Sequence, residues 1–129
     1  MMYDLPTSLN VCGVDYEIRS DYRAALDVLA VFAAADLTNE QKALAALDIF
    51  YPDFLKMPDE HIPEAMKQMT WFLDCGDEGD NRKRPKLMDW EQDFQYIVSP
   101  INRVVGREVR AMSYFHWWSF VSAYYELGD

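Results

Sequence analysis

The stretch Tyr114–Tyr125, YFHWWSFVSAYY, decides how the rest of the chain has to fold. It holds two tryptophans, two phenylalanines and three tyrosines within twelve positions. Aromatic side chains each bury about 150–250 Å² and dominate protein cores and interfaces. A segment this dense in rings must pack against the core of its own chain or against a partner.

Helical periodicity divides this stretch into two faces. We expect a helix that begins near residues 111–113 and packs its inward face on the helix before it. The side chains expected inside are Tyr114, Trp117, Val121 and Tyr124, with Phe94, Ile97 and Ile101 as their neighbours. Phe115, Phe120 and Trp118 form the other face, which we expect to contact another subunit or a client helix, because aromatic residues anchor such interfaces.

The preceding helix is predicted between Asp89, a good N-cap, and Gly106. Its apolar residues recur at helical spacing from Trp90 to Val105. Pro100 interrupts this pattern. Because the proline ring opposes the carbonyl of Tyr96, we expect a kink or break near that position.

The N-terminal part predicts a hairpin and three helices. Residues 5–19 alternate in polarity around Gly13, which favours a β-hairpin that lies against the helices. Asp21 is a plausible cap for a helix over 22–35, and Thr38 with Gln41 forms a capping box for a helix over 39–51. A third helix ends near Leu73, with Gly76 expected as its C′ residue.

Residues 76–88 are expected to form a mobile loop, because glycines, a proline and patches of both charges follow one another there. The predicted fold class is therefore mainly α (α+β). A single domain over residues 1–129 combines the hairpin (5–19), helices one to three (22–75), the loop (76–88) and an aromatic helical pair (89–129), with about five helices in a compact bundle.

The charge balance argues against a nucleic-acid partner. Lys and Arg number 12 and Asp and Glu 22, a formal net charge of −10, whereas nucleic-acid binding depends on basic contacts to phosphate. We expect no membrane insertion either, because the longest purely apolar run, Val28–Ala35, falls short of the roughly 20 residues that cross a bilayer. Cys12 and Cys75 fit no metal spacing and are expected to be reduced thiols.

The sequence contains no recognisable catalytic motif. His61 and His116 lie in no metal-ligand pattern, no nucleophile–base or phosphate-binding motif occurs, and we expect neither cofactor nor metal. A small metal-dependent hydrolase that uses His116 with Glu108 or Asp93 stays open as an alternative. Arg103 and Arg110, which can bridge to Glu108, either tie the last two helices together or face a partner.

Aromatic and charged positions together define a candidate partner surface. The candidate partner-binding residues are Trp90, Phe94, Arg103, Arg110, Phe115, Trp118 and Phe120. We interpret the segment His116-Trp117-Trp118 as the junction between the fold and a partner rather than as an active site.

Three groups of residues in the last third of the chain carry a family resemblance. They are Asp89-Trp90-Glu91-Gln92-Asp93-Phe94, then Asn102-Arg103-Val104 with Gly106, Glu108 and Arg110, and finally His116-Trp117-Trp118 with Phe120 and Glu126-Leu127-Gly128. Their combined spacing resembles that of a family of phage and prophage proteins of Gram-positive bacteria, named for gene product fifteen. The spacing as a whole is specific, whereas no single piece is.

The resemblance implies a tail assembly chaperone of long-tailed phages, a protein without enzymatic activity. Such a chaperone coats the helical tape measure protein, keeps it soluble and recruits tail-tube subunits in the cytoplasm of the bacterial host. The implied partners are thus the tape measure and tail-tube proteins, and we expect a homo-oligomer. A minor structural component of the virion is the alternative.

Overall fold

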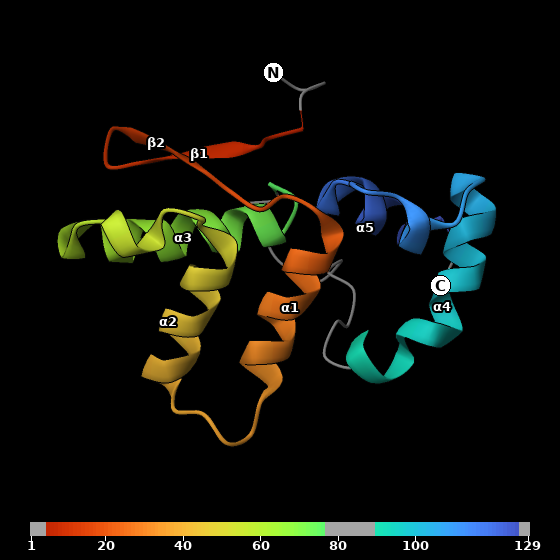
Figure 1. Ribbon diagram of the computed structural model, residues 1–129, viewed down its shortest axis with the longest axis horizontal. Coiled ribbons are helices and arrows are strands. Elements are labelled where there is room, and N and C mark those ends of the chain that lie inside the picture. The colour runs from red at the N-terminus through yellow and green to blue at the C-terminus, as the bar shows by residue number, and fades with distance from the viewer. Residues whose placement is uncertain (1–4, 77–89, 127–129) are drawn as a thin grey trace.

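The hairpin and the helices expected from the sequence form in the order predicted (Figure 1). The computed structural model describes residues 5–76 and 90–126, and the side chains of residues 5–76 and 98–126. Within these residues a two-stranded hairpin precedes five α-helices, so the mainly helical fold class is confirmed. The expected loop over 76–88 lies, apart from Gly76, outside the described residues.

Strands β1 (Ser8–Val11) and β2 (Val14–Glu17) pair antiparallel, with Val11 opposite Val14. The two loop residues have positive φ, 54° at Cys12 and 86° at Gly13. Positive φ at both positions defines a turn whose twist matches that of the flanking strands, so the role predicted for Gly13 is confirmed. Leu9, Val11 and Tyr16 are buried whereas Val14 is exposed, and β1 packs on helix α3 (Ile62–Leu73).

Helices α1 (Tyr22–Ala33) and α2 (Asn39–Phe50) form an antiparallel pair (Figure 1). The predicted capping box is present: Thr38 Oγ1 accepts from the Gln41 amide at 3.1 Å, and Gln41 Oε1 accepts from the Thr38 amide at 2.9 Å. α1 ends two residues before the predicted boundary, because Ala34 is extended (ψ 129°) and starts the turn to Thr38. α2 ends at Phe50, since Tyr51, which precedes a proline, is extended too.

The short 3₁₀ segments η1 (Phe54–Lys56) and η2 (Asp59–His61) lead into α3. At the end of α3 the Cys75 amide donates to the Phe72 carbonyl and the Gly76 amide donates to the Trp71 carbonyl, each at 2.9 Å. This is a Schellman motif with Cys75 at C′ (φ 59°), so the assignment of Gly76 to C′ is wrong by one residue.

Helix α4 (Trp90–Val105) contains Pro100, and Figure 1 shows it bending within its length, as the proline predicts. It ends where expected, at Gly106, whose φ is 85° and whose amide donates to the Asn102 carbonyl at 2.7 Å. A 3₁₀ turn, η3 (Val109–Ala111), and a further non-helical segment follow before α5 (Trp117–Tyr125) begins.

The expected start of the last helix near residues 111–113 is wrong. An antiparallel bridge joins Asp21 and His116: the Tyr22 amide donates to the Phe115 carbonyl and the Trp117 amide to the Ser20 carbonyl, each at 2.8 Å. Backbone groups used in this way are not available to a helix, so α5 starts at Trp117. The core that results is aromatic, and its largest fully buried side chains are Trp117, Tyr22, Tyr51, Phe50, Phe72 and Phe120.

Candidate functional site

The predicted division of the aromatic stretch into two faces holds only in part. Trp117 and Val121 are buried, as expected, and Tyr124 is partly buried. Tyr114, expected inside, is 47% exposed because it precedes the helix and lies outside its periodicity. Phe120, expected to face a partner, is fully buried and stacks on Tyr22 with ring centroids 4.7 Å apart. Phe120 is therefore a core residue, and its assignment to a partner surface is wrong.

The two tryptophans bind the end of α3. Trp117 Nε1 donates to the Leu73 carbonyl at 3.1 Å, and Trp118 Nε1 donates to the Phe72 carbonyl at 2.8 Å. Carbonyl oxygens in the last turn of a helix have no intrahelical donor. The Trp117 indole supplies one to Leu73, and the Trp118 indole adds a donor to the Phe72 carbonyl beside the Cys75 amide. Gly76 lies against the rings of Trp118 and Trp71, since a Cβ at this position would be 3.0 Å from Trp118 and 3.2 Å from Trp71.

Trp118 and Phe115 remain partly exposed. The Trp118 ring stacks on Phe72 at 5.8 Å, and Phe115 meets the edge of Tyr22 at 6.2 Å. Each ring thus packs against the core on one side and leaves part of its surface exposed to solvent. The side chains of Trp90 and Phe94 lie outside the described residues.

Arg110 and Arg103 have different surroundings. Arg110 is exposed and forms a two-pronged contact with Glu108, with Nε and Nη2 2.9 and 2.8 Å from the carboxylate oxygens. These hydrogen bonds from Arg110 lower the pKa of Glu108 to about 2. Arg103 is exposed in the last turn of α4. The structure therefore bears out the contact between Arg110 and Glu108.

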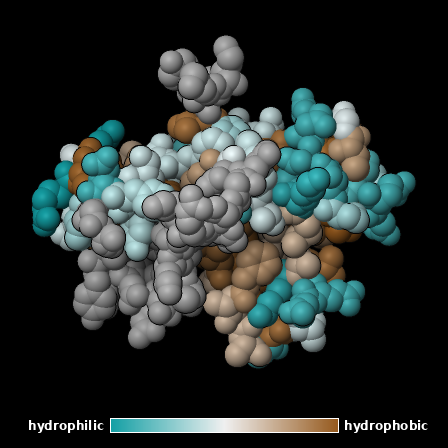
Figure 2. Space-filling model, turned by 180° about the vertical axis from the view of Figure 1, so that it is seen from behind, coloured by the Kyte–Doolittle hydropathy of each residue, from teal (hydrophilic) through white to brown (hydrophobic). Residues whose placement is uncertain are grey.

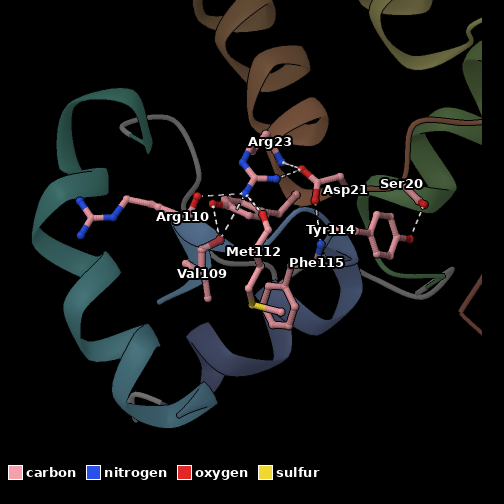
Figure 3. Close-up of polar contacts among 9 residues, drawn as sticks. Ser20, Asp21, Arg23, Val109, Arg110, Met112, Tyr114 and Phe115 are labelled. Atoms are coloured by element: carbon pink, nitrogen blue, oxygen red, sulfur yellow. Dashed lines mark hydrogen bonds and ion pairs between the residues drawn. The ribbon is translucent and has the colours of Figure 1, made fainter. Parts of the chain in front are cut away.

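A polar clamp at the start of α1 holds the segment before α5 (Figure 3). Asp21 caps α1 through the Arg23 amide and accepts from the Phe115 amide at 2.7 Å with its other oxygen. The guanidinium of Arg23 donates to Asp21 and to the carbonyls of Val109, Arg110 and Met112. One arginine thus satisfies several carbonyls of a non-helical segment.

His116 is buried and both of its ring nitrogens are occupied. Nδ1 accepts from the Trp118 amide at 3.0 Å and so caps α5, which leaves Nε2–H to donate to the Pro6 carbonyl at 2.7 Å. These contacts require the neutral ring, and burial lowers the pKa of His116. Neither nitrogen contacts a carboxylate among the described residues, and the side chain of Asp93 lies outside them.

Other features give little indication of a ligand. Among the described side chains of residues 5–76 and 98–126, no three His, Cys, Asp or Glu residues gather as a metal ion would require. An open groove of about 750 Å³ runs between the N-terminal segment, the end of β2 and Tyr114. Its polar side chains serve the fold: Arg19 donates to carbonyls at the end of α2, and the Ser20 and Tyr114 hydroxyls are hydrogen-bonded at 2.6 Å.

Helix α1 exposes an apolar surface that the sequence interpretation missed. Ten of its 12 residues are apolar, all but Arg23 and Asp27, yet only three are buried. A stripe of incompletely buried side chains at positions i, i+3, i+4 and i+7 consists of Leu26, Leu29, Ala30 and Ala33, here called the α1 stripe. Figure 2, which views the molecule from behind Figure 1, shows hydrophobic side chains gathered over α1 and α2.

A signal for this surface was present in the sequence. The run Val28–Ala35 contains no polar residue, so the helix predicted over 22–35 is apolar on more than one face. Among the described residues, no helix has both the length and the apolar character that a bilayer crossing requires. A helix that is apolar on nearly every side is normally buried, so the incompletely buried part of α1 is a candidate interaction surface.

Comparison with known families identifies the chain. The family model described as Bacteriophage Gp15 protein matches residues 1–129. The chain therefore belongs to this family and is a phage protein. Comparisons with curated proteins and with solved structures found no match.

Proposed function

We propose that this member of the bacteriophage Gp15 family is a tail assembly chaperone that binds helical segments of the tape measure protein. The observation that carries the proposal is the α1 stripe, whose apolar side chains the fold buries only in part. Amphipathic helices dock on such surfaces through side chains at i, i+3, i+4 and i+7.

The charge of the chain supports the same role. A tape measure protein is a long helical client that tends to aggregate, and its chaperone has to stay dispersed while it covers apolar surface. A net charge of −10 provides the mutual repulsion that opposes aggregation. The role requires no catalytic residues, and the one buried histidine, His116, is engaged in capping a helix.

The remaining parts of the proposal concern assembly. We propose that the chain self-associates through apolar helices, recruits tail-tube subunits and acts in the cytoplasm of the bacterial host. The incompletely buried rings of Phe115 and Trp118 offer further contact surface for such partners.

Co-expression with the tape measure protein of the same phage tests the proposal. The chaperone should raise the soluble fraction of the tape measure protein and elute with it in size-exclusion chromatography with light scattering. An insoluble tape measure protein beside a chain that stays monomeric at every concentration would contradict the proposal.

A minor structural component of the virion is a second candidate, because permanent subunit contacts are also rich in apolar residues, as α1 is. Mass spectrometry of purified particles separates the two functions. A chaperone should be missing from finished tails, whereas a structural component should be present in them at a fixed ratio to the other tail proteins.

A further inference from the structure

The α1 stripe begins where α1 contacts the segment before α5. Tyr22 meets Phe115 at 6.2 Å, and Arg23 donates to the Met112 carbonyl. Leu26 follows one turn later on the same side of α1, because residues three and four apart are neighbours on a helix. The side chains of Met112 and Phe115 lie next to each other and are partly exposed (Figure 3). They therefore extend the stripe beyond the start of α1.

The spacing and the size of the side chains suit a second helix. Positions i, i+3, i+4 and i+7 form the seam at which two helices pack. Ala30 and Ala33 have short side chains, so a partner helix can come close to the backbone of α1 there. Twelve residues of helix are about 18 Å long, which matches a client segment of about three turns.

Unpaired negative charge lies around the stripe. The carboxylates of Asp27, Asp36 and Glu40 are exposed and make no hydrogen bond or ion pair with any other described residue. Both cations of the α1–α2 pair, by contrast, bind backbone carbonyls: Arg23 binds those that precede α5, and Lys42 binds that of Phe32 at 2.9 Å. The acidic groups are therefore left to attract positive charge on a partner.

We infer that the α1 stripe binds an amphipathic helix whose apolar side chains are flanked by lysine or arginine. This inference rests on the proposed function for the helical nature of the client. It adds which surface of the chain binds the client and which charge the client carries beside its apolar side chains. Apolar contacts supply the affinity, and the carboxylates select the charge of the segment.

Peptide titrations test this site directly. Three synthetic peptides of about 18 residues are compared. One has leucine at the seam positions flanked by lysine, one has the same leucines flanked by glutamate, and one is the lysine peptide in scrambled order, which should not bind. The lysine peptide should shift the backbone amide resonances of α1 in ¹⁵N spectra. It should also bind at least tenfold more tightly than the glutamate peptide at low salt, with a smaller difference at about 0.5 M NaCl.

Variants of the chain separate the apolar and the charged contributions. Leu26→Gln and, at a less buried position, Ala30→Gln should each weaken binding of the lysine peptide at least tenfold. Leu55→Gln should not, because Leu55 is 89% exposed but lies on η1. Thermal melts of each variant show whether it remains folded.

The charge test uses matched pairs. Asp27→Asn with Asp36→Asn should remove the preference for lysine. Asp53→Asn with Asp59→Asn changes the net charge equally and should leave the preference intact, because Asp53 directly precedes η1 and Asp59 begins η2.

The possible failures are distinguishable. Equal affinity for the lysine and glutamate peptides, or amide shifts that avoid α1, would exclude this site even if the wild-type chain captures the tape measure protein. Peptide binding at α1 without capture of the tape measure protein would support the site and overturn the proposed chaperone function.

Discussion

Replacing Trp117 with alanine should remove the largest contact of the core. The side chain is fully buried, its ring stacks on Phe120 with centroids 5.8 Å apart, and its Nε1 donates to the Leu73 carbonyl. It joins α5 to the end of α3, elements separated by 44 residues in the sequence at this contact. The substitution therefore acts on packing and on the end of a helix together.

The expected loss follows from the buried area. Removing about 200 Å² of aromatic surface at about 25 cal/mol/Å² gives about 5 kcal/mol. Core substitutions of tryptophan by alanine typically cost about 3–5 kcal/mol. We therefore expect Trp117→Ala to lower the free energy of unfolding by about 4 kcal/mol and Tm by roughly 10–20 °C. Domains of ordinary stability have only about 5–15 kcal/mol, so the variant should be close to unfolding.

Urea denaturation followed by circular dichroism measures this loss. Trp117→Phe keeps most of the apolar volume but removes the donor to the Leu73 carbonyl, and it should cost about 2 kcal/mol. Trp118→Ala, at a partly exposed position, should cost less than Trp117→Ala. A loss below about 1.5 kcal/mol for Trp117→Ala, or a larger loss for Trp118→Ala, would refute the assignment of Trp117 to the centre of the core.

Three further changes test contacts that fix the segment before α5 and the end of α3. Burial lowers the pKa of His116 in the folded chain, so the unfolded chain binds a proton at this residue first as the pH falls. The free energy of unfolding should therefore decline below about pH 6.5. Urea denaturation between pH 7.5 and 5 measures this decline. Gly76→Ala should cost about 2 kcal/mol in the same assay, because the new Cβ would lie 3.0 Å from an indole carbon at a φ of 76°. Arg23→Met should cost about 1–3 kcal/mol and speed amide hydrogen exchange over residues 109–116, since carbonyls there lose their donor.

Each of these changes has a matched control. His116→Asn keeps a capping side chain but has no titrating ring, so an unchanged pH dependence would exclude His116 as its source. Gly106→Ala introduces a Cβ at a φ of 85° with nothing within 4 Å, and a loss equal to that of Gly76→Ala would mean that the indoles do not matter. Arg19→Met removes a donor at the end of α2 and should leave exchange over residues 109–116 unchanged.

Local signals explain which parts of the fold could be predicted. The Thr38–Gln41 capping box, the turn at Gly13 and the end of α4 at Gly106 depend on residues within a few positions of one another. Such interactions can be identified without knowledge of the fold. The start of α5 could not be predicted, because it depends on a bridge between Asp21 and His116, which are far apart in the sequence.

The candidate site shows the same limit. Periodicity placed Phe120 and Trp117 on different faces of a helix, but α5 packs on more than one side. Both rings are fully buried, and α5 contacts α1 and α4 as well as the end of α3. Assigning one buried stripe to a helix assumes that the helix packs on one side only. That assumption fails for a helix that packs on several sides. The run Val28–Ala35 shows the opposite case: it is apolar throughout, yet within α1 only Val28 of this run is buried, because a run of apolar residues does not reveal how much of the helix its neighbours cover.

The position of the aromatic stretch in the core determines which experiments can report on a partner. Trp117 and Trp118 donate to α3 carbonyls, and His116 caps α5 and donates to the N-terminal segment. A substitution at any of these three residues therefore changes the fold in addition to any effect on a partner. Loss of a partner in such a variant cannot be separated from loss of structure. Ala30 and Ala33 contribute little to the core, and substitutions there change the surface alone. A binding defect confined to the α1 stripe is therefore the result that would connect this fold to tail assembly.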